Sequence, residues 1–404
     1  MKIPGVLGKA VRVARDDGGR LLGMRAVRFA ANRLNVAALD DNIYDADVAD
    51  SATLELSLPD RRPRRGTPLN IGWIVVPPAR GSGGHTTLFR MIEGLETAGH
   101  RCTILIHDRH RGDLREQEQV IREWWPRIRA SVSSAADAIV GFDACVASSW
   151  ETAHVLACRA TAPMRRLYFV QDYEPYFYPR GGVYATAEDT YRFGFRNIAL
   201  GQMVAGALNR EVGVDADVTQ FGCDTDVYRP LPNLRRTGVV LYSRPDTPRR
   251  GFWLACAALA RFHAMHPEVP IHLYGARVAG LPFPATSHGR LTPMELNELY
   301  NRCIAGIALS FTNISLVAAE MLAAGTIPVV NDSSDARADL RSSYVEWAHP
   351  TPTALATALS RAVAREGREE RARLGARSVA GLSWRIAQRD VVGIVEDEVY
   401  GCQV

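Results

Sequence analysis

Arginines that could bind phosphate gather directly after one apolar run of the chain. Arg244, Arg249 and Arg250 lie in a polar loop that follows the predicted strand 238–243. Guanidinium groups match phosphate oxygens bidentately, so at a strand end these side chains could neutralise a diphosphate leaving group without a metal ion. Arg244 and Arg250 are therefore candidate catalytic residues, and Arg249 is a further candidate contact to the substrate that carries the diphosphate, called the donor below. Their spacing also fits solvent-exposed arginines of an ordinary polar loop.

A lone carboxylate follows in the second half of the sequence. Glu320 lies in a predicted helix, 316–324, whose other residues are apolar or small. An unpaired charge is costly there, so Glu320 needs polar partners, and the two hydroxyls of a ribose are suitable ones. A glutamate bonded to nearby backbone or to an arginine is the alternative. The preceding residues, Asn313, Ile314 and Ser315, and the first helical residue, Leu316, would offer an N-capped helix start to donor phosphates.

A glycine turn near the beginning of the chain could bind an oxygen-rich or anionic ligand. Gly83 and Gly84 lead from an apolar strand into a helix, and His85 follows them. Glycines allow close approach of backbone to a ligand, and the helix start presents N–H groups and partial positive charge. Gly83 and Gly84 are candidate contacts to the donor, and His85 is a candidate catalytic residue that would contact an acceptor or a transferred sugar. Any tight strand-to-helix turn could use the same residues.

An aromatic and acidic stretch, 168–179, has side chains suited to carbohydrate. The candidate acceptor contacts are Gln171, Asp172, Tyr173, Glu174 and Tyr176. Aromatic faces pack on sugar C–H groups, while carboxylates and amides accept bonds from hydroxyls. Asp172 ends a predicted strand and is the candidate for orienting the acceptor hydroxyl as a catalytic residue. The alternative is that the aromatics are core residues and the carboxylates are caps.

Apolar strands alternate with helical stretches in two successive series, which predicts an α/β protein with two Rossmann-like domains and parallel sheets. Ligands in such sheets bind at the carboxyl ends of strands, where all these candidates lie. The predicted strands are 69–76, 101–106, 144–148, 167–171, 238–243, 271–274, 305–309 and 328–331, and the predicted helices are 86–98, 252–266, 293–301 and 316–324. Residues 53–58 alternate like a further short strand.

Composition excludes several broad classes. The 404 residues are 47% hydrophobic and 23% charged, as in a globular protein, and the net charge of +4 is too weak to argue for nucleic acid. Seven scattered cysteines without a C-x-x-C pair predict reduced thiols, and neither a signal peptide nor a spanning segment is evident. We therefore expect a cytoplasmic protein.

The first segment is unusually basic. Its charged residues are Lys2, Lys9, Arg12, Arg15, Arg20, Arg25, Arg28 and Arg33 against Asp16 and Asp17, with apolar residues between them. This mixture could lie on an anionic membrane at the inner face of the cell, or cap the first domain. The predicted divisions are a basic extension at 1–65, an acceptor domain at 66–230, a nucleotide-sugar donor domain at 231–382, and a C-terminal helix at 383–404 that crosses back to the first domain.

From about Asn70 to about Ala380 the chain resembles the GT-B glycosyltransferases of family 4. The resemblance rests on Gly83–His85 with Gly99 and His100, on the joint Phe221–Pro230, and on Glu320–Val330. The family usually has two glutamates with seven residues between them. The second corresponds to Glu320, and the position of the first is occupied here by Thr312. The stretch 168–179 and the Arg-Pro-x-x-x-x-Arg loop resemble a branch of rhamnosyltransferases that build bacterial surface glycans from dTDP-L-rhamnose.

The resemblance implies a metal-independent transferase that needs no cofactor beyond its nucleotide-sugar donor. The implied reaction moves a sugar to a glycan or lipid-linked acceptor for cell-surface polysaccharide. The first candidate for this sugar is L-rhamnose, taken from dTDP-L-rhamnose. A UDP- or GDP-sugar donor is an alternative. So is a noncatalytic nucleotide- or glycan-binding protein on the same fold, which Thr312 would favour. A Rossmann dehydrogenase is disfavoured, because no G-x-G-x-x-G follows the first strand.

Overall fold

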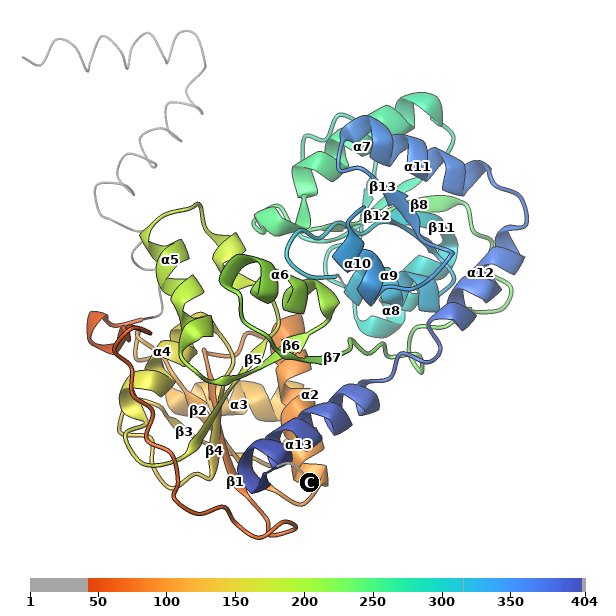
Figure 1. Ribbon diagram of the computed structural model, residues 1–404. Helices are drawn as coiled ribbons and strands as arrows, with labels where there is room; N and C mark the ends of the chain where they lie inside the picture. The colour runs from red at the N-terminus through yellow and green to blue at the C-terminus, as the bar shows by residue number, and fades with distance from the viewer. Residues whose placement is uncertain (1–42, 315, 402–404) are drawn as a thin grey trace, which may run out of the picture.

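The computed structural model describes residues 43–314 and 316–401, which form two α/β domains that face each other (Figure 1). The first domain holds a seven-stranded sheet in the order β3-β2-β1-β4-β5-β6-β7, and the second a six-stranded sheet in the order β10-β9-β8-β11-β12-β13. Neighbouring strands are parallel in both sheets. The predicted GT-B class, with two Rossmann-like domains, is therefore confirmed.

The strands are β1 Asn70–Val75, β2 Arg101–Ile106, β3 Ser131–Ser134, β4 Ala144–Ala147, β5 Arg165–Val170, β6 Arg196–Leu200, β7 Asp217–Thr219, β8 Gly238–Ser243, β9 Ile271–Gly275, β10 Thr286–Ser287, β11 Cys303–Ile307, β12 Ile327–Asn331 and β13 Glu346–Ala348. The α-helices are α2 Gly83–Thr97, α3 Leu114–Trp124, α4 Trp150–Arg159, α5 Gly182–Asp189, α6 Gln202–Val212, α7 Phe252–Met265, α8 Pro293–Arg302, α9 Leu316–Ala323, α10 Ser334–Asp339, α11 Pro352–Ala364, α12 Arg368–Ser378 and α13 Trp384–Tyr400. Short 3-10 turns are η2 Asp45–Asp47, η3 Glu174–Phe177, η4 Thr190–Arg192 and η5 Pro248–Arg250.

The central strands are apolar on both faces because helices cover both sides of each sheet. All four residues of β4 are buried, as are all five of β11 and of β12. Burial on both faces explains why these strands read as continuous apolar runs. Each sheet therefore forms the middle layer of its own domain and presents its carboxyl-end loops toward the other domain (Figure 1).

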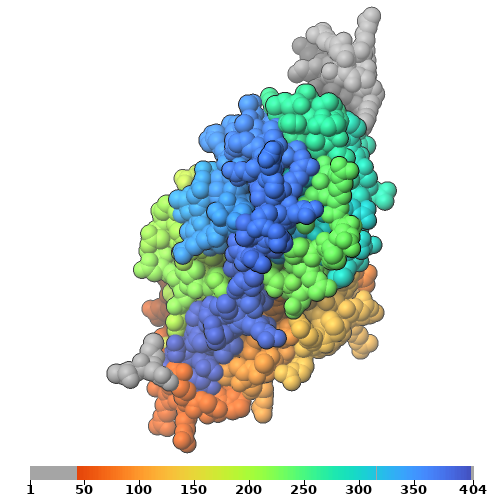
Figure 2. All heavy atoms as spheres, turned by 90° about the vertical axis from the view of Figure 1, so that its right-hand side faces the viewer, coloured from red at the N-terminus to blue at the C-terminus, as the bar shows by residue number. Residues whose placement is uncertain are grey.

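The C-terminal helix returns to the first domain. Val391, Val395 and Val399 of α13 are buried in the same core as Leu88 and Met91 of α2. Figure 2 shows this blue segment running from the second domain down onto the first. Two connections therefore join the domains, one after β7 and one before α13.

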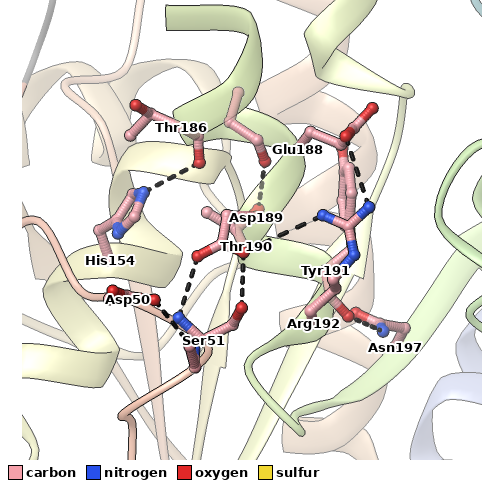
Figure 3. A network of polar contacts seen from close by, with 12 residues as sticks. Asp50, Ser51, His154, Thr186, Glu188, Asp189, Thr190, Tyr191, Arg192 and Asn197 are labelled. Atoms are coloured by element: carbon pink, nitrogen blue, oxygen red, sulfur yellow. Dashed lines mark hydrogen bonds and ion pairs between the residues drawn. The ribbon is translucent and has the colours of Figure 1, made fainter. Parts of the chain in front are cut away.

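A strap formed by residues 43–58 lies on the first domain, with the short η2 helix at Asp45–Asp47 and a turn at 51–53. The predicted strand at 53–58 is wrong, because these residues pair with no sheet. Side-chain contacts hold the strap instead. Both the backbone N and the Oγ of Ser51 donate to the Asp189 carboxylate, at 3.0 and 2.6 Å (Figure 3).

The strap also fixes which ring nitrogen of a buried histidine carries the proton. His154 Nδ1 accepts from the backbone N of Ala49 at 3.1 Å, so the ring proton lies on Nε2 and points to the Thr186 carbonyl (Figure 3). Burial lowers the pKa of His154, in keeping with a neutral ring. The strap is thus an integral part of the first domain, while the basic residues between Lys2 and Arg33 lie outside the described residues.

Within residues 43–314 and 316–401, no helix is long and apolar enough to cross a bilayer.

Candidate active site between the domains

Loops that follow β5 and β11 meet between the two domains. The Thr312 Oγ1 donates to Asp172 Oδ1 at 2.6 Å, and Asn313 Nδ2 donates to the Gln171 carbonyl at 3.2 Å. Thr312 is only 3% exposed and Asn313 is buried, whereas Asp172 and Gln171 are half-buried. The structure therefore places the carboxylate predicted to orient the acceptor against the loop predicted to bind the donor.

Arg250 lies behind this contact, in the second domain. Its Nη1 donates to Ser310 Oγ at 2.6 Å and to Asn313 Oδ1 at 3.3 Å. Gly251 follows with a φ of 59°, and a Cβ there would lie 2.9 Å from Leu309 Cδ1. Only glycine suits that position, so the turn that aims Arg250 depends on it. Burial lowers the pKa of Arg250 and the Asp172 carboxylate opposes the shift, so the guanidinium stays a cation at neutral pH.

The other two arginines of the loop lie differently. Arg249 packs its guanidinium over the Phe177 ring of the first domain, 4.3 Å from the ring centroid, and its buried Nε has no hydrogen-bond partner among the described residues. Arg244 is exposed, with its Nη1 3.1 Å from the Tyr242 hydroxyl. Arg249 and Arg250 therefore direct positive charge toward the first domain, while Arg244 is the more solvated of the three.

Opposing effects set the charge of Asp172. Burial raises the pKa of this carboxyl, whereas Arg249, Arg250 and the Thr312 hydrogen bond lower it. The Thr312 hydroxyl has one proton, and it points at Oδ1, which must therefore act as an acceptor. Oδ2 receives no hydrogen bond from the described residues and could accept one from a substrate hydroxyl.

The Glu320 carboxylate makes no hydrogen bond or ion pair with residues that the structure describes, and the side chain lies half-buried on α9. Burial raises its pKa to about 7, the Asp224 carboxylate adds to the rise, and Arg90 opposes it. Its neighbours belong to an interdomain ion pair, since Arg90 on α2 bonds both oxygens of Asp224 at 2.8 and 2.6 Å. An unsatisfied carboxyl at this position can accept bonds from ligand hydroxyls.

The glycine turn is formed as predicted, but its histidine points back onto it. Gly83 begins α2, and the Ser82 side chain caps the helix by accepting from the His85 backbone N. The His85 ring lies 3.0 Å from Ser82 Oγ and 3.2 Å from the Val76 carbonyl. Burial lowers the His85 pKa, so the ring is neutral near pH 7. A Cβ on Gly84 would lie 3.9 Å from Gln171 Oε1, which places this turn beside the Asp172 loop.

Two of the predicted acceptor contacts bond within the first domain. Tyr173 is fully buried and donates to Glu188 on α5 at 2.9 Å. This position corrects the prediction for Tyr173, because a side chain used in the core cannot also line the surface between the domains. Glu174 is half-buried, and its Oε2 caps α4 by accepting from the Trp150 backbone N at 2.5 Å and from the Tyr168 hydroxyl at 3.0 Å, so its acceptor contact stays a prediction.

The remaining predicted site residues lie in different parts of the structure. Tyr176 is 40% exposed and its hydroxyl donates to Glu211 on α6 at 2.8 Å. The Ile314 side chain is a core residue of the second domain, so it could offer a ligand only its backbone. Leu316 opens α9 and is half-buried, while Ser315, predicted as the helix cap, lies outside the described residues.

Sequence reasoning did not assign four residues that the structure brings to this region. Thr312 contacts Asp172, Ser310 holds Arg250, and Arg90 pairs with Asp224 beside Glu320. Asp224 lies within the joint passage 221–230 that carried the family resemblance, so that passage was the available signal for it. Thr312 stands at the position of the family's first glutamate, so the resemblance marked that position as well. Ser310 and Arg90 have no such signal.

Comparison with known proteins agrees with this architecture. The N-terminal domain of the WsaF family matches residues 116–203 and its C-terminal domain matches residues 237–360, together just over half of the chain. The O-antigen biosynthesis protein RfbC of Myxococcus xanthus is 32% identical over 258 residues, 60% of this chain. The match spans only 20% of RfbC, about a fifth of that relative's length.

Solved structures with the same fold are more distant in sequence. Sucrose-phosphate synthase from Thermosynechococcus elongatus is 17% identical with a TM-score of 0.62, over 81% of this chain and 98% of that one. Anabaena Alr3699/HepE in complex with UDP-glucose is 14% identical with a TM-score of 0.63, over 81% and 99%. At these identities the likeness concerns the fold. With both domains matched in order, the chain is a WsaF-like protein with the two-domain GT-B fold of glycosyltransferases.

Proposed function

We propose that the chain is a glycosyltransferase of cell-surface polysaccharide synthesis, which moves a sugar from a nucleotide-sugar donor to a glycan or lipid-linked acceptor. The observation that carries the proposal is the meeting of Asp172 from the first domain with the Arg250 loop of the second. An acceptor-orienting carboxylate and phosphate-binding cations thus lie on opposite domains, as transfer between two bound substrates requires. The resemblance to RfbC supports the assignment to surface glycans.

The donor side supplies the groups for a nucleoside diphosphate. Arg249 and Arg250 would neutralise the charge that develops on the diphosphate as the bond from the anomeric carbon to its oxygen breaks. Glu320 would accept hydrogen bonds from the ribose or deoxyribose hydroxyls of the nucleotide. Two arginines that are already desolvated supply the positive charge that a divalent ion supplies elsewhere, so the proposed reaction needs no metal.

The acceptor side supplies Asp172. Its Oδ2 would accept the hydrogen bond of the acceptor hydroxyl and orient the oxygen toward the anomeric carbon. The oxygen–carbon bond forms as the carbon–oxygen bond to the diphosphate breaks, and the leaving diphosphate takes the electron pair. The hydroxyl proton passes to Asp172 or to the leaving phosphate. Glycine backbone at Gly83 and Gly84, next to Gln171, leaves room for the transferred sugar on this side.

The donor is proposed to be dTDP-L-rhamnose. Support comes from the stretch 168–179 and from the Arg244–Arg250 loop, which resemble rhamnosyltransferases of surface glycan synthesis. A deoxyribose offers Glu320 one hydroxyl, whereas the ribose of UDP or GDP offers two. Donor classes can therefore be distinguished by binding, before any acceptor is known.

A thermal-shift screen with dTDP, UDP, GDP and ADP tests the donor side, because a ligand that binds the native state raises apparent stability. We expect stabilisation by dTDP to exceed that by the purine nucleotides. Transfer is then assayed with dTDP-L-rhamnose and a membrane lipid extract that contains lipid-linked saccharides. Binding without release of dTDP in that assay would favour the noncatalytic alternative.

The basic segment between Lys2 and Arg33, outside the described residues, is proposed to bring the enzyme to anionic membrane surfaces at the cytoplasmic face. Each charge that reaches the surface would contribute about 1 kcal/mol. Flotation with anionic liposomes compares the full chain with a chain that begins at Ile43, which retains the strap. We expect only the full chain to float, and less so at high salt. Equal, salt-insensitive flotation would assign the segment a structural role.

A further inference from the structure

Thr312 is a buried hydroxyl whose hydrogen bond crosses from one domain to the other. Its loop is held on both sides, since the Ser310 backbone N donates to Asn331 at 2.8 Å and the Phe311 backbone N donates to the Arg249 carbonyl at 3.1 Å. The adjacent Asn313 is tied to the Gln171 carbonyl. A hydroxyl on a loop with so many fixed neighbours has little freedom to turn away from Asp172.

We propose that Thr312 is a positioning residue that fixes the Asp172 carboxylate for transfer, and that it does so only while the two domains are closed on each other. The inference rests on the proposed function, because it assigns Thr312 a part in the same reaction. Domain closure would then complete the site by bringing a donor-side hydroxyl to an acceptor-side carboxylate. Thr312 would hold Oδ1, which leaves Oδ2 aimed at the acceptor hydroxyl.

The charges around Asp172 agree with this role. Arg249 and Arg250 face it from the second domain and favour the ionised form, as the Thr312 hydrogen bond does. Glu174, the other carboxyl that interacts with Asp172, lies on its own domain and caps α4. Every group that stabilises the ionised form therefore comes from the donor domain, so opening of the domains would remove all three together.

A second interdomain contact lies apart from these residues and provides a test of closure. Asp339 of α10, in the second domain, accepts from the backbone N of Gln202 and of Met203 at the start of α6, at 2.5 and 2.9 Å. Removing this carboxylate would weaken closure without touching Asp172 or its neighbours. Asp339→Asn therefore tests whether the state of Asp172 depends on domain closure, while Thr312→Val tests the direct contact.

The test compares Thr312→Val, Thr312→Ser and Asp339→Asn with the wild type in the dTDP-L-rhamnose transfer assay over a range of pH. We expect Thr312→Val to lower kcat by roughly ten-fold, the scale of a hydrogen bond to a charged group, with the donor KM changed less than about two-fold. The acid limb of its pH profile should move to higher pH, because the ionised carboxylate loses a donor. Thr312→Ser should restore both. Asp339→Asn should move the acid limb in the same direction, because weaker closure withdraws Thr312, Arg249 and Arg250 from Asp172 together.

A wild-type kcat and pH profile in Thr312→Val would overturn the inference. An acid limb that stays at the wild-type position in Asp339→Asn would overturn its dependence on domain closure. A second readout does not depend on activity: the Asp172 carboxyl is titrated by NMR in protein with carbon-13-labelled aspartate, with Asp172→Asn to assign the signal. A higher titration midpoint in Thr312→Val than in Thr312→Ser supports the inference, and equal midpoints contradict it. If the wild type transfers no sugar, the proposed function fails, and this titration alone decides whether Thr312 controls Asp172.

Discussion

Arg90 and Asp224 form a two-bond ion pair that joins α2 of the first domain to the segment leading into the second. The nitrogen–oxygen distances are 2.8 and 2.6 Å, and the Arg90 guanidinium also lies 4.7 Å from the centroid of the Trp384 ring at the start of α13. Both connections between the domains therefore meet at one arginine. The same pair flanks Glu320 and affects its charge in opposite directions, Asp224 raising the pKa and Arg90 lowering it.

Replacement of this arginine should loosen the joint. Arg90→Ala removes an ion pair in which the two side chains are 18% and 41% exposed, together with a cation–π contact. Because the pair is partly solvated, we expect a loss of about 1 to 2 kcal/mol in the free energy of unfolding, measured by urea denaturation. Arg115→Ala, at an exposed position of α3, is the control. Equal stability of the two variants would show that the pair contributes nothing.

Glu320 should contribute to nucleotide affinity and not to folding. Loss of its bonds to sugar hydroxyls in Glu320→Ala should cost about 1 to 3 kcal/mol of binding free energy, measured by titration calorimetry with dTDP and UDP. UDP should lose more than dTDP, since it offers a second hydroxyl. Glu298→Ala, an exposed change on α8, is the matched control. Unchanged affinity in a folded Glu320→Ala protein would exclude the assigned contact.

Glu320 should also make stability depend on pH. Its pKa of about 7 in the folded protein is above the ordinary value of 4.5, so the folded state holds a proton that the unfolded chain releases. Stability from this group is present below about pH 4.5 and is lost as the pH rises through about 7. Glu320→Gln removes this contribution to the pH dependence. The unfolding free energy of the variant minus that of the wild type should therefore rise by about 1 to 3 kcal/mol between pH 4.5 and 7. A constant difference between pH 4.5 and 8 would mean that the Glu320 pKa is not raised.

Activity should survive chelation. Arg249 and Arg250 are fixed cations beside the proposed diphosphate position, so EDTA should leave the transfer rate unchanged, while Arg250→Ala should lower it by a hundred-fold or so. The measurement is release of nucleoside diphosphate with and without EDTA. Loss of activity on chelation, restored by a divalent cation, would assign the charge neutralisation to a metal.

The sequence predicted the frame of the fold well where apolar residues run without interruption. The predicted strands at 101–106 and 238–243 have those bounds in the structure, because both are buried by helices on their two faces. Strand β6 was missed, since Arg196 and Asn197 break its apolar pattern. Asn197 is buried nonetheless, and its amide donates to the Tyr191 carbonyl (Figure 3).

The candidate site was predictable only in part. Residue type and position after a strand were enough to select Asp172 and Arg250, which the structure brings to the same region. They could not show which way a side chain points, so Tyr173 was assigned to the acceptor surface although it is a core residue, and the capping of α4 by Glu174 was not foreseen. The resemblance marked Thr312 as the residue at the family's first glutamate position, but its contact with Asp172 could not be predicted, because the two residues are 140 positions apart in the chain.

Sugar transfer itself is tested most directly by following dTDP release from dTDP-L-rhamnose together with mass analysis of the glycosylated lipid product. The membrane lipid extract serves as acceptor, UDP-glucose as the alternative donor, and Asp172→Asn as the matched variant. The proposed transfer predicts dTDP release coupled to a product heavier by one deoxyhexose, and at least a hundred-fold slower reaction in Asp172→Asn. A folded wild-type protein that binds dTDP but releases none, with either donor, or an Asp172→Asn variant as fast as the wild type, would contradict it.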